Sequence, residues 1–434
     1  MRRLTIGCAC AGLLVLAVPV AAVRYRIDVF AGSGAVGTPD AVGDGLPADA
    51  GFLDAPTGLA RDRRGNVYIA DHGHARVRRV RTSHGLRVMM TVAGTGVRGF
   101  AGDGGPATEA ELTLPTGLAV MRDGALLVTD AGSDAGGNTV RRIDARGIIH
   151  AFAGVGDAPP GDGGDGGPAN RATLATPLRT AVARNGDVYV VELNGNRVRV
   201  VRAADRSIRP YAGHGEPGDA GDGGQALEAL LDQPAGLALA RDGTLYIADF
   251  GNERIRVVSP DGIINALAGT GVRTGSIDGE GGDPGDDLGD GGPAAAATFY
   301  KPTGLALARD GALLVADQGN SRIRLIAPDA SGAPGPTSMV TTIIGSGVAG
   351  FGGDGGDARA AQLLIPTDVL PLPRGRLLVA DRGNGRVRIA VPVAETNLCS
   401  AGCGDGDPCT IDRCDRERGC LHEPAPARAV CRGR

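Results

Sequence analysis

The chain contains no tryptophan, and aromatic residues make up only 3% of its 434 positions. This absence weakens a carbohydrate-binding role, because sugar faces favour stacking on large aromatic rings. An excess of one charge is also missing, since 45 basic side chains stand against 49 acidic ones. Proteins that bind nucleic acid gather cations against the phosphate backbone. We therefore expect no nucleic-acid partner.

Long apolar runs are absent from the rest of the chain. After the N-terminal segment, no stretch reaches 18 uninterrupted apolar residues. No membrane span is therefore expected in the mature chain. Glycine accounts for 73 residues, a level hostile to long helices, because each glycine inside a helix costs about 1 kcal/mol relative to alanine. Hydrophobic residues still make up 42% of the chain, which is enough for a large core. These features predict an all-β chain rich in turns.

Residues 1–22 have the pattern of an export signal. Met1–Arg3 is basic, Leu4–Val18 is apolar, and the small residues Val20–Ala22 suit a signal peptidase, so we expect a mature start at Val23. An uncleaved anchor is the alternative, because the segment from Leu4 to Val23 is about long enough to cross a bilayer. The rest of the chain is expected to be exported, to the extracellular space, the cell surface or the periplasm.

A sixfold internal repeat fills the middle of the chain. Each copy has a proline followed by small and apolar residues, an acid 15 residues after the proline, and a glycine-flanked aspartate 12 residues before it. Two fixed spacings in six copies indicate one structural unit used six times. The prolines are Pro56, Pro115, Pro177, Pro234, Pro302 and Pro366. The later acids, called the closing acids below, are Asp71, Asp130, Glu192, Asp249, Asp317 and Asp381. The glycine-flanked aspartates are Asp44, Asp103, Asp165, Asp222, Asp290 and Asp354.

Each unit is expected to contain four short strands. Residues 303–308 and 312–316 exemplify the first two strands, which an Arg-Asp-Gly turn joins. The closing acid then opens an Asp-x-Gly-Asn turn, whose Gly and Asn tolerate the positive φ that a tight hairpin demands. The third strand alternates cations with β-branched residues, as at 254–257, and the fourth ends at an Ala-Gly-x-Gly turn, as at 263–268. Six such units predict a β-propeller, which hides its strand edges by radial repetition.

The two ends of the repeat region complement each other. The sixth unit runs through its third strand, Arg386–Val391, and has no fourth strand. An orphan fourth strand, Tyr25–Phe30, lies at the mature N-terminus. We expect this strand to complete the last blade, so that residues 23–393 form a closed, monomeric six-bladed propeller.

The units resemble NHL repeats, in the bacterial secreted variety. The resemblance is carried by VAGTGVRGFAGDGGPA at 92–107, by LPTGLA at 114–119, and by the acid and the Arg-Ile/Val-Arg strand that follow. It extends over residues 24 to about 393 and implies a propeller that serves as a platform for binding other molecules, without naming a ligand. Two units depart from the pattern, through an insertion at 132–137 and through Glu192–Asn196 in place of the Asp-x-Gly-Asn turn.

The closing acids are interpreted as structural. Identical acids in all six units lie in symmetry-related hairpins around a ring, whereas a metal or acid–base site needs side chains that converge. The glycine-flanked aspartates are expected to cap turns, since they lack the alternating carboxylates of a calcium loop. We expect each closing acid to accept backbone N–H groups in its own hairpin, or to pair with a third-strand arginine such as Arg76, Arg197, Arg254, Arg322 or Arg386.

Two departures from the repeat point to the central channel. Two residues after the proline, four units carry glycine, which suits a crowded axis, while units three and six carry Arg179 and Asp368. Units three and six face each other across a sixfold ring. The pair could therefore bind a small polar ligand or close the channel by pairing with each other, and ordinary drift between repeats would also explain it.

An acidic insertion between units four and five is a candidate Ca²⁺ site, and no other cofactor is expected. Residues 272–288 carry five acids among glycines, an arrangement that suits weak Ca²⁺ binding, although a mobile acidic loop is the alternative. The acids are Asp278, Glu280, Asp283, Asp286 and Asp287.

Residues 394–434 form a cysteine-rich tail. In an exported protein its six cysteines predict three disulfides, of unknown connectivity. The stretch 403–422 resembles a short repeat of secreted proteins from myxobacteria-like bacteria and slime moulds, which implies surface attachment or matrix contact; a passive C-terminal cap is the alternative. The cysteines are Cys399, Cys403, Cys409, Cys414, Cys420 and Cys431.

Together these features predict an exported, non-enzymatic binding or scaffold protein. It would present its inter-blade loops to a protein or to a cell-envelope polymer. The alternative is a metal-dependent propeller hydrolase or lyase with its site at the mouth of the central channel. Against that alternative, the inner strands are nearly all Thr, Gly, Leu and Ala, and apart from Arg179 and Asp368 they offer no cluster of metal ligands.

Overall fold

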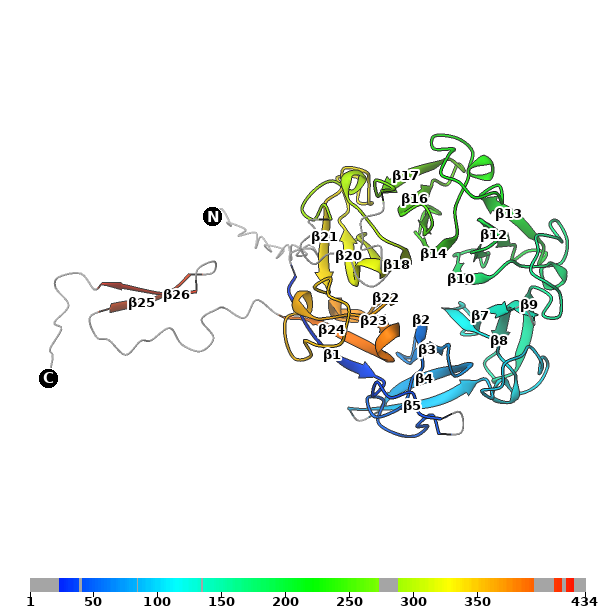
Figure 1. The fold of residues 1–434 in the computed structure, drawn as a ribbon, viewed down its shortest axis with the longest axis horizontal. Helices are drawn as coiled ribbons and strands as arrows, with labels where there is room; N and C mark the ends of the chain where they lie inside the picture. The colour runs from blue at the N-terminus through cyan, green and yellow to red at the C-terminus, as the bar shows by residue number, and fades with distance from the viewer. Residues whose placement is uncertain are drawn as a thin grey trace, which may run out of the picture.

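Six four-stranded antiparallel sheets are arranged as blades around a central axis (Figure 1). The chain passes round the ring in sequence order, from the blue first blade to the orange sixth. This computed structural model describes residues 23–38, 41–83, 85–133, 136–272, 288–393, 410–415 and 419–424. It confirms the all-β, six-bladed propeller that the internal repeat predicts.

Within each blade the strands follow the chain from the axis outward. Blade one contains β2 (Pro56–Arg61), β3 (Val67–Asp71), β4 (Arg76–Ser83) and β5 (Leu86–Ala93). Blade two contains β6 (Pro115–Val120), β7 (Leu126–Ser133), β8 (Gly136–Ile143) and β9 (Ile149–Ala153). Blade three contains β10 (Pro177–Val182), β11 (Val188–Glu192), β12 (Arg197–Val201) and β13 (Ile208–Ala212). Every innermost strand begins at the repeat proline, as expected.

The remaining blades have the same plan. Blade four contains β14 (Pro234–Leu239), β15 (Leu245–Asp249), β16 (Arg254–Val258) and β17 (Ile264–Ala268). Blade five contains β18 (Pro302–Leu307), β19 (Leu313–Asp317), β20 (Arg322–Ile326) and β21 (Val340–Ile344). Blade six contains β22 (Pro366–Pro371), β23 (Leu377–Asp381), β24 (Arg386–Pro392) and, from the start of the propeller, β1 (Tyr25–Ala31).

Strand β1 closes the ring. It pairs antiparallel with β24, with Tyr25 opposite Pro392 and Ile27 opposite Ala390, and it forms the outer edge of blade six. The predicted latch is therefore confirmed. Because one blade is built from both ends of the repeat region, opening the ring would require separating these two strands.

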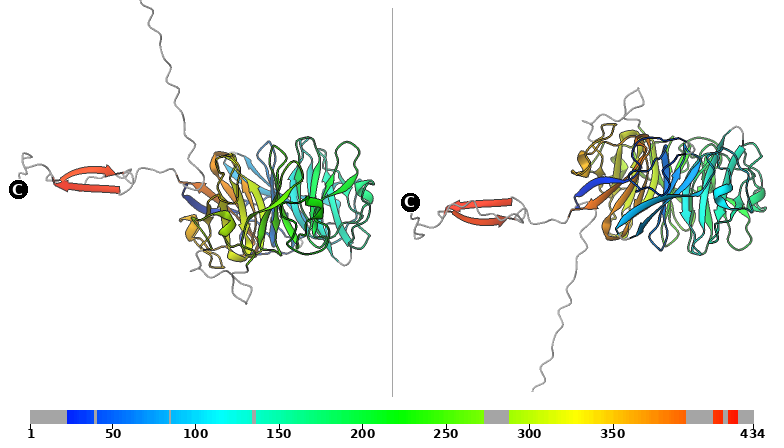
Figure 2. Two further views of the ribbon diagram at one scale, coloured as in Figure 1. Left: turned by 90° about the horizontal axis from the view of Figure 1, so that it is seen from above. Right: turned by 90° about the horizontal axis from the view of Figure 1, so that it is seen from below.

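The hydrophobic core is divided among the junctions between blades. Six clusters of buried residues each join two neighbouring blades, including blades six and one. At the junction of blades four and five, Ile255 and Leu313 are fully buried with Phe299, which lies in the loop that enters blade five. Burying one such side chain contributes about 1.5–3 kcal/mol. Loops cover both faces of the disc, as the edge-on views show (Figure 2).

The Asp-x-Gly-Asn turns differ in detail from the expectation. Their Gly and Asn do not have positive φ; the next residue does, at Glu253 (φ 56°), Ser321 (φ 51°) and Gly385 (φ 58°). The turn glycine is needed for space instead, because a Cβ on Gly251 would strike the side chain of Asp232. The asparagine acts through its side chain and donates to the closing acid of its own turn.

Each blade holds one fully buried arginine on its third strand. In blade five, Arg324 Nη2 lies 2.8 Å from Asp290 Oδ1, and Nη1 donates to the carbonyl of Thr298 at 2.9 Å. Both partners lie in the loop that precedes the blade, so the arginine fastens this loop to the sheet. The six arginines are Arg78, Arg141, Arg199, Arg256, Arg324 and Arg388. Their partners are Asp44, Asp103, Asp165, Asp222, Asp290 and Asp354, so the expectation of simple turn caps missed the main partner of these aspartates.

In the tail, β25 (Thr410–Asp415) and β26 (Gly419–Pro424) form a two-stranded hairpin whose register places Cys414 opposite Cys420. The other four cysteines lie outside the described residues, and the disulfides stay a prediction. Across the ranges that the structure describes, no helix is both long and apolar enough to cross a membrane.

Replacing Arg256 with methionine is expected to destabilise the propeller by about 3–5 kcal/mol, because it leaves the buried carboxylate of Asp249 without its cation. Urea unfolding followed by circular dichroism measures the change. Arg209→Met is the matched control: Arg209 is exposed and lies 3.8 Å from Asp205, so its loss should cost less than about 1 kcal/mol. Equal effects of the two substitutions would contradict a central role for the buried arginine.

Candidate functional site

The closing acids are fully buried and bonded within their own blades. In blade five, Asp317 accepts the backbone N–H of Tyr300 and the side-chain amide of Asn320, each at 2.9 Å. Its other contact is the buried Arg324, at 3.3 Å. We had expected the backbone donor in the hairpin of the acid itself, but it lies in the loop before the innermost strand. These carboxylates therefore have no open face toward a ligand.

The arginine that meets each closing acid is generally not the expected one. In five blades the acid faces the second arginine of the third strand, for example Asp249 with Arg256 at 3.4 Å. The first arginine turns to a carbonyl of the Ala-Gly-x-Gly turn, as Arg254 does to Thr270 at 3.1 Å. Arg197 does pair with its acid, because the longer Glu192 reaches both cations of its strand.

Asp130, in blade two, has a different environment from the other closing acids. It accepts the backbone N–H groups of Thr113 and Leu114 at 2.8 and 2.6 Å, and it has no ion pair among those seen in the described residues. Burial raises the pKa of Asp130 to about 7, against these two hydrogen bonds and the more distant Arg141. Burial also raises the pKa values of Asp249 and Asp381, each to about 6.

The two sequence-predicted channel residues meet at the axis. Arg179 Nη1 lies 3.2 Å from Asp368 Oδ2, although the residues come from blades three and six. Nη2 also donates to the carbonyls of Thr367 and Thr57, at 2.8 and 3.1 Å, and Nη1 to that of Thr116 at 3.2 Å. One guanidinium thus joins blade three to three other blades at the axis, which matches the pairing alternative.

Close packing of the inner strands surrounds this pair. A Cβ on Gly58 would strike the carbonyl of Thr116 in the next blade, and one on Gly236 would strike that of Thr303. The expectation that glycine suits a crowded axis is therefore supported. Burial raises the pKa of Asp368, while Arg179 and the N–H of Leu59, which donates at 2.8 Å, oppose this shift.

Two histidines share the blade-one hairpin but do not form a metal site. His72 Nδ1 lies 3.3 Å from the carbonyl of Pro115, and burial lowers the pKa of His72 to about 4. His74 Nδ1 lies 2.9 Å from Asp71 Oδ2; burial opposes protonation, but the hydrogen bond to Asp71 raises the pKa of His74 overall. Within the ranges that the structure describes, no three His, Cys, Asp or Glu side chains gather around a common point.

The candidate Ca²⁺ residues lie outside the described part of the chain. They are Asp278, Glu280, Asp283, Asp286 and Asp287, and the structure describes nothing between residues 272 and 288. The Ca²⁺ site thus remains a prediction from the sequence.

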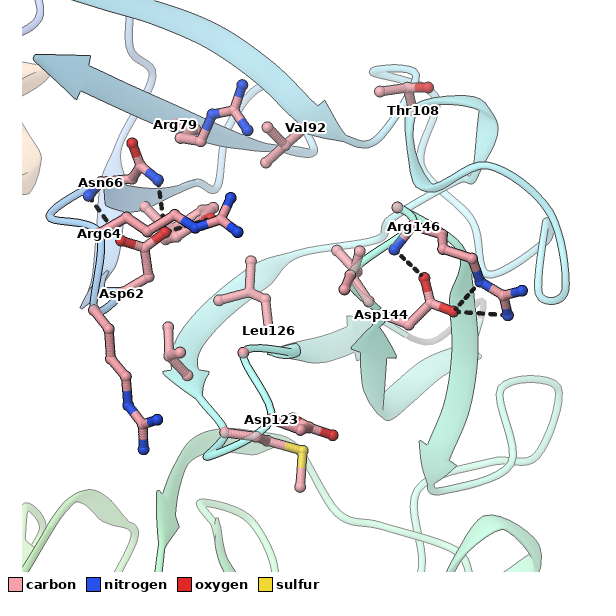
Figure 3. A pocket seen from close by; sticks show the side chains of 18 of the residues that line it. Asp62, Arg64, Asn66, Arg79, Val92, Thr108, Asp123, Leu126, Asp144 and Arg146 are labelled. Carbon is pink, nitrogen blue, oxygen red and sulfur yellow. Dashed lines mark hydrogen bonds and ion pairs between the residues drawn. The ribbon is translucent and has the colours of Figure 1, made fainter. Parts of the chain in front are cut away.

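A groove of about 660 Å³ opens between blades one and two (Figure 3). The turn between β2 and β3 forms one wall, and the turns β6–β7 and β8–β9 of blade two form the other. Arg64 and Arg79 lie on the blade-one side, with Arg146 across from them (Figure 3). Beneath the charged rim, Leu126 and Val92 continue the apolar core between the two blades. We call this feature the blade 1–2 groove.

Sequence reasoning missed the blade 1–2 groove, although the repeat contains a signal for it. Arg79 takes the third-strand position that is aliphatic in blades three to six. Arg64 takes a turn position that is aspartate in blades two, four and five. Comparing the six units position by position would have marked both residues.

Comparison with known proteins agrees with the fold. A family model of the teneurin NHL domain matches residues 210–278. Over 296 residues the chain is 32% identical to teneurin-3 of Danio rerio, an alignment that covers 60% of this chain and 10% of the teneurin. The fold and this match together support an NHL-repeat propeller. The chain spans about a tenth of the length of the curated relatives it matches first.

Solved structures share the propeller fold. A structural genomics protein of unknown function from Bacteroides thetaiotaomicron gives a TM-score of 0.58 at 14% identity, over 85% of this chain and 76% of that one. An auxiliary nutrient binding protein from Bacteroides ovatus gives 0.56 at 15% identity, over 86% and 78%. At such identities the likeness to these two structures shows the fold alone. A model of a Dictyostelium (slime mold) repeat matches residues 402–424 in the tail.

The unfolding free energy is expected to fall as the pH rises from about 4 to 7, partly through Asp130. Its pKa is about 7 in the folded state and about 3.9 in an unfolded chain, so the folded state holds the extra proton across this window. Asp130→Asn should remove that part of the slope in urea unfolding at pH 5 and pH 7.5. The exposed Asp205→Asn is the control, and an Asp130 variant with the slope of the wild type would contradict the assignment.

The axial pair is expected to be strongly coupled. Either Arg179→Gly or Asp368→Gly alone leaves one buried charge without its partner. The double variant instead restores the glycine that four blades carry at this position. A double-mutant cycle in urea should give a coupling of about 1–3 kcal/mol, with the double variant more stable than the sum of the single effects predicts. Additive losses would show that the two side chains do not depend on each other.

Proposed function

We propose that this chain is an exported, non-enzymatic binding protein whose NHL-type propeller presents its loops to a protein or cell-envelope partner. One observation carries the proposal. The closing acids and the buried third-strand arginines that recur through the blades are bonded inside the propeller, while the blade 1–2 groove among the surface turns is lined by exposed arginines. The polar side chains that remain available to a partner thus lie on surface loops.

The polar groups at the axis are bonded to one another, which supports a binding function over catalysis. A hydrolase or lyase at the channel mouth needs polar groups that a substrate or metal can reach. Here Arg179 forms an ion pair with the carboxylate of Asp368 and donates hydrogen bonds to three backbone carbonyls around the axis. The closing acids, which would otherwise be candidates, are fully buried with their own partners. The described polar groups at the axis therefore serve to join blades.

Export and a monomeric state belong to the same proposal. The basic, apolar and small-residue pattern of residues 1–22 supports export, and so does the crowding of cysteines in the tail. Closure of the ring by β1 supports a monomer, because it leaves no incomplete blade for a second copy to fill.

The full-length protein is expected to co-sediment saturably with isolated cell envelopes and to leave them chemically unchanged. Envelopes are incubated with increasing protein and pelleted, and the supernatant is examined by mass spectrometry. The variant in which Arg179 and Asp368 are both replaced by glycine should bind as the wild type does, because the proposed surface is not at the axis.

Three outcomes would contradict this function. Failure of the envelopes to retain the protein would remove the binding role. Release of new fragments by the wild type, but not by the double-glycine variant, would favour the channel-mouth enzyme. A rise in melting temperature with Ca²⁺ or Zn²⁺ that is lost in Asp368→Asn would support the same alternative, since a ligand at 100 times its Kd adds about 2.7 kcal/mol.

A further inference from the structure

The blade 1–2 groove has an excess of cations on its rim. Five arginines and three aspartates line it, although the chain as a whole carries a net charge of −4. An adjoining hollow of about 330 Å³ shares Arg64 and Arg79 and adds Arg81. Arg63, Arg64 and Arg122 are exposed and take part in no ion pair within the described residues. These guanidinium groups are open to an anion.

The three aspartates do not neutralise these arginines. Asp62 accepts the backbone N–H of Asn66 at 2.8 Å and its side-chain amide at 2.6 Å. Asp123 pairs with Arg142 at 2.6 Å, and Asp144 with Arg146 at 3.3 Å (Figure 3 shows the second pair). Each acid is thus committed to its own turn or to a neighbouring arginine. The free cations face the groove without a fixed counter-charge.

The blade-one turn is built differently from those of blades two, four and five, and the difference places a cation on the rim. In blades two and four, the aspartate at the turn position, Asp123 or Asp242, accepts the N–H two residues later at 3.0 Å. In blade one that position is Arg64, and Asp62 takes over by accepting from Asn66. The turn keeps its hydrogen bond while its exposed corner changes from an acid to a cation.

A second exchange lies on the third strand. Arg79 stands where blades three to six place Val200, Val257, Leu325 and Ile389. Its guanidinium lies beside the hydroxyl of Tyr68, where burial and Asp62 raise the pKa of the tyrosine and Arg79 opposes the rise. A cation at a position that is aliphatic in four blades reduces apolar burial between the blades. The structural role of the strand does not require it, since four other blades lack it.

The floor of the groove is apolar. Leu126 and Ile143 are 5% and 7% exposed, and Val92 and Val120 pack against the same cluster. Guanidinium groups bind carboxylates in a paired, directional way, and an apolar floor accepts an aliphatic side chain. Among the described residues, Tyr68 is the only aromatic one that lines the groove, which disfavours the stacking that sugars favour. Carboxylates beside an aliphatic group are a feature of acidic peptides.

We propose that the blade 1–2 groove binds an acidic peptide segment of a partner protein. Its carboxylates pair with Arg63, Arg64, Arg79 and Arg122, and an aliphatic side chain between them packs on Leu126 and the apolar floor. This assignment rests on the proposed binding function and names the surface and the class of partner.

The test uses a fluorescein-labelled peptide, Glu-Glu-Leu-Glu-Glu, and a matched peptide with Gln in place of each Glu. Fluorescence anisotropy is measured with the full-length protein at 50 and 200 mM NaCl. The wild type should bind the Glu peptide at least tenfold more tightly than the Gln peptide. Binding should weaken at the higher salt concentration, because exposed charges are screened.

The decisive variant carries Arg64→Asp and Arg79→Val, which are residues that other blades have at these two positions. It should keep the melting temperature of the wild type and bind the Glu peptide at least tenfold more weakly. The control is Arg241→Asp, an exposed arginine in the equivalent turn of blade four, which should bind within twofold of the wild type.

Four results would overturn the proposal: no binding of the Glu peptide by the wild type, equal binding of the Gln peptide, unchanged binding by the Arg64→Asp/Arg79→Val variant, or an equal loss in the Arg241 control. Oligogalacturonate that competes at lower concentration than the peptide would reassign the groove to an acidic polysaccharide. The proposed function is judged separately, by the envelope and melting experiments described above.

Discussion

The propeller depends on one buried arginine in each blade. A guanidinium with no exposure to water must have all its charge compensated by nearby groups, because an unpaired buried charge is strongly destabilising. In blade six, Arg388 satisfies this requirement with Asp354 and the carbonyl of Gln362 from the preceding loop, and with Asp381 from the neighbouring strand. The same contact that neutralises the cation fixes the loop, so a glycine-rich connection is held in place without helices.

This arrangement explains why the charged residues that recur in the six units have a structural role. Twelve recurring acids and six buried arginines form internal networks, and the carboxylates of the closing acids are out of reach of a ligand. Differences between blades are therefore more informative about function than the features that all blades share. Asymmetry arises at the axis, where Arg179 and Asp368 replace glycine, and at the junction of blades one and two.

The two asymmetric sites have opposite consequences. At the axis, a cation and an acid from distant blades form an ion pair, and the guanidinium group joins four blades through its hydrogen bonds. At the blade 1–2 groove, cations are added without acids that could pair with them, and the charge remains available on the surface. A propeller with its axial charges paired, and with arginines at one groove that are unpaired within the described residues, is what the proposed binding at the loops requires.

The sequence by itself determined the number of blades, the start of each inner strand and the closing role of β1, because these follow from spacing and alternation along the chain. It also located Arg179 and Asp368. It did not decide which arginine meets each closing acid, since Arg254 and Arg256 lie on the same face of one strand. Nor did it reveal the blade 1–2 groove. These features depend on side chains brought together from different turns and blades, such as two axial residues 189 positions apart, and only the tertiary structure sets their distances.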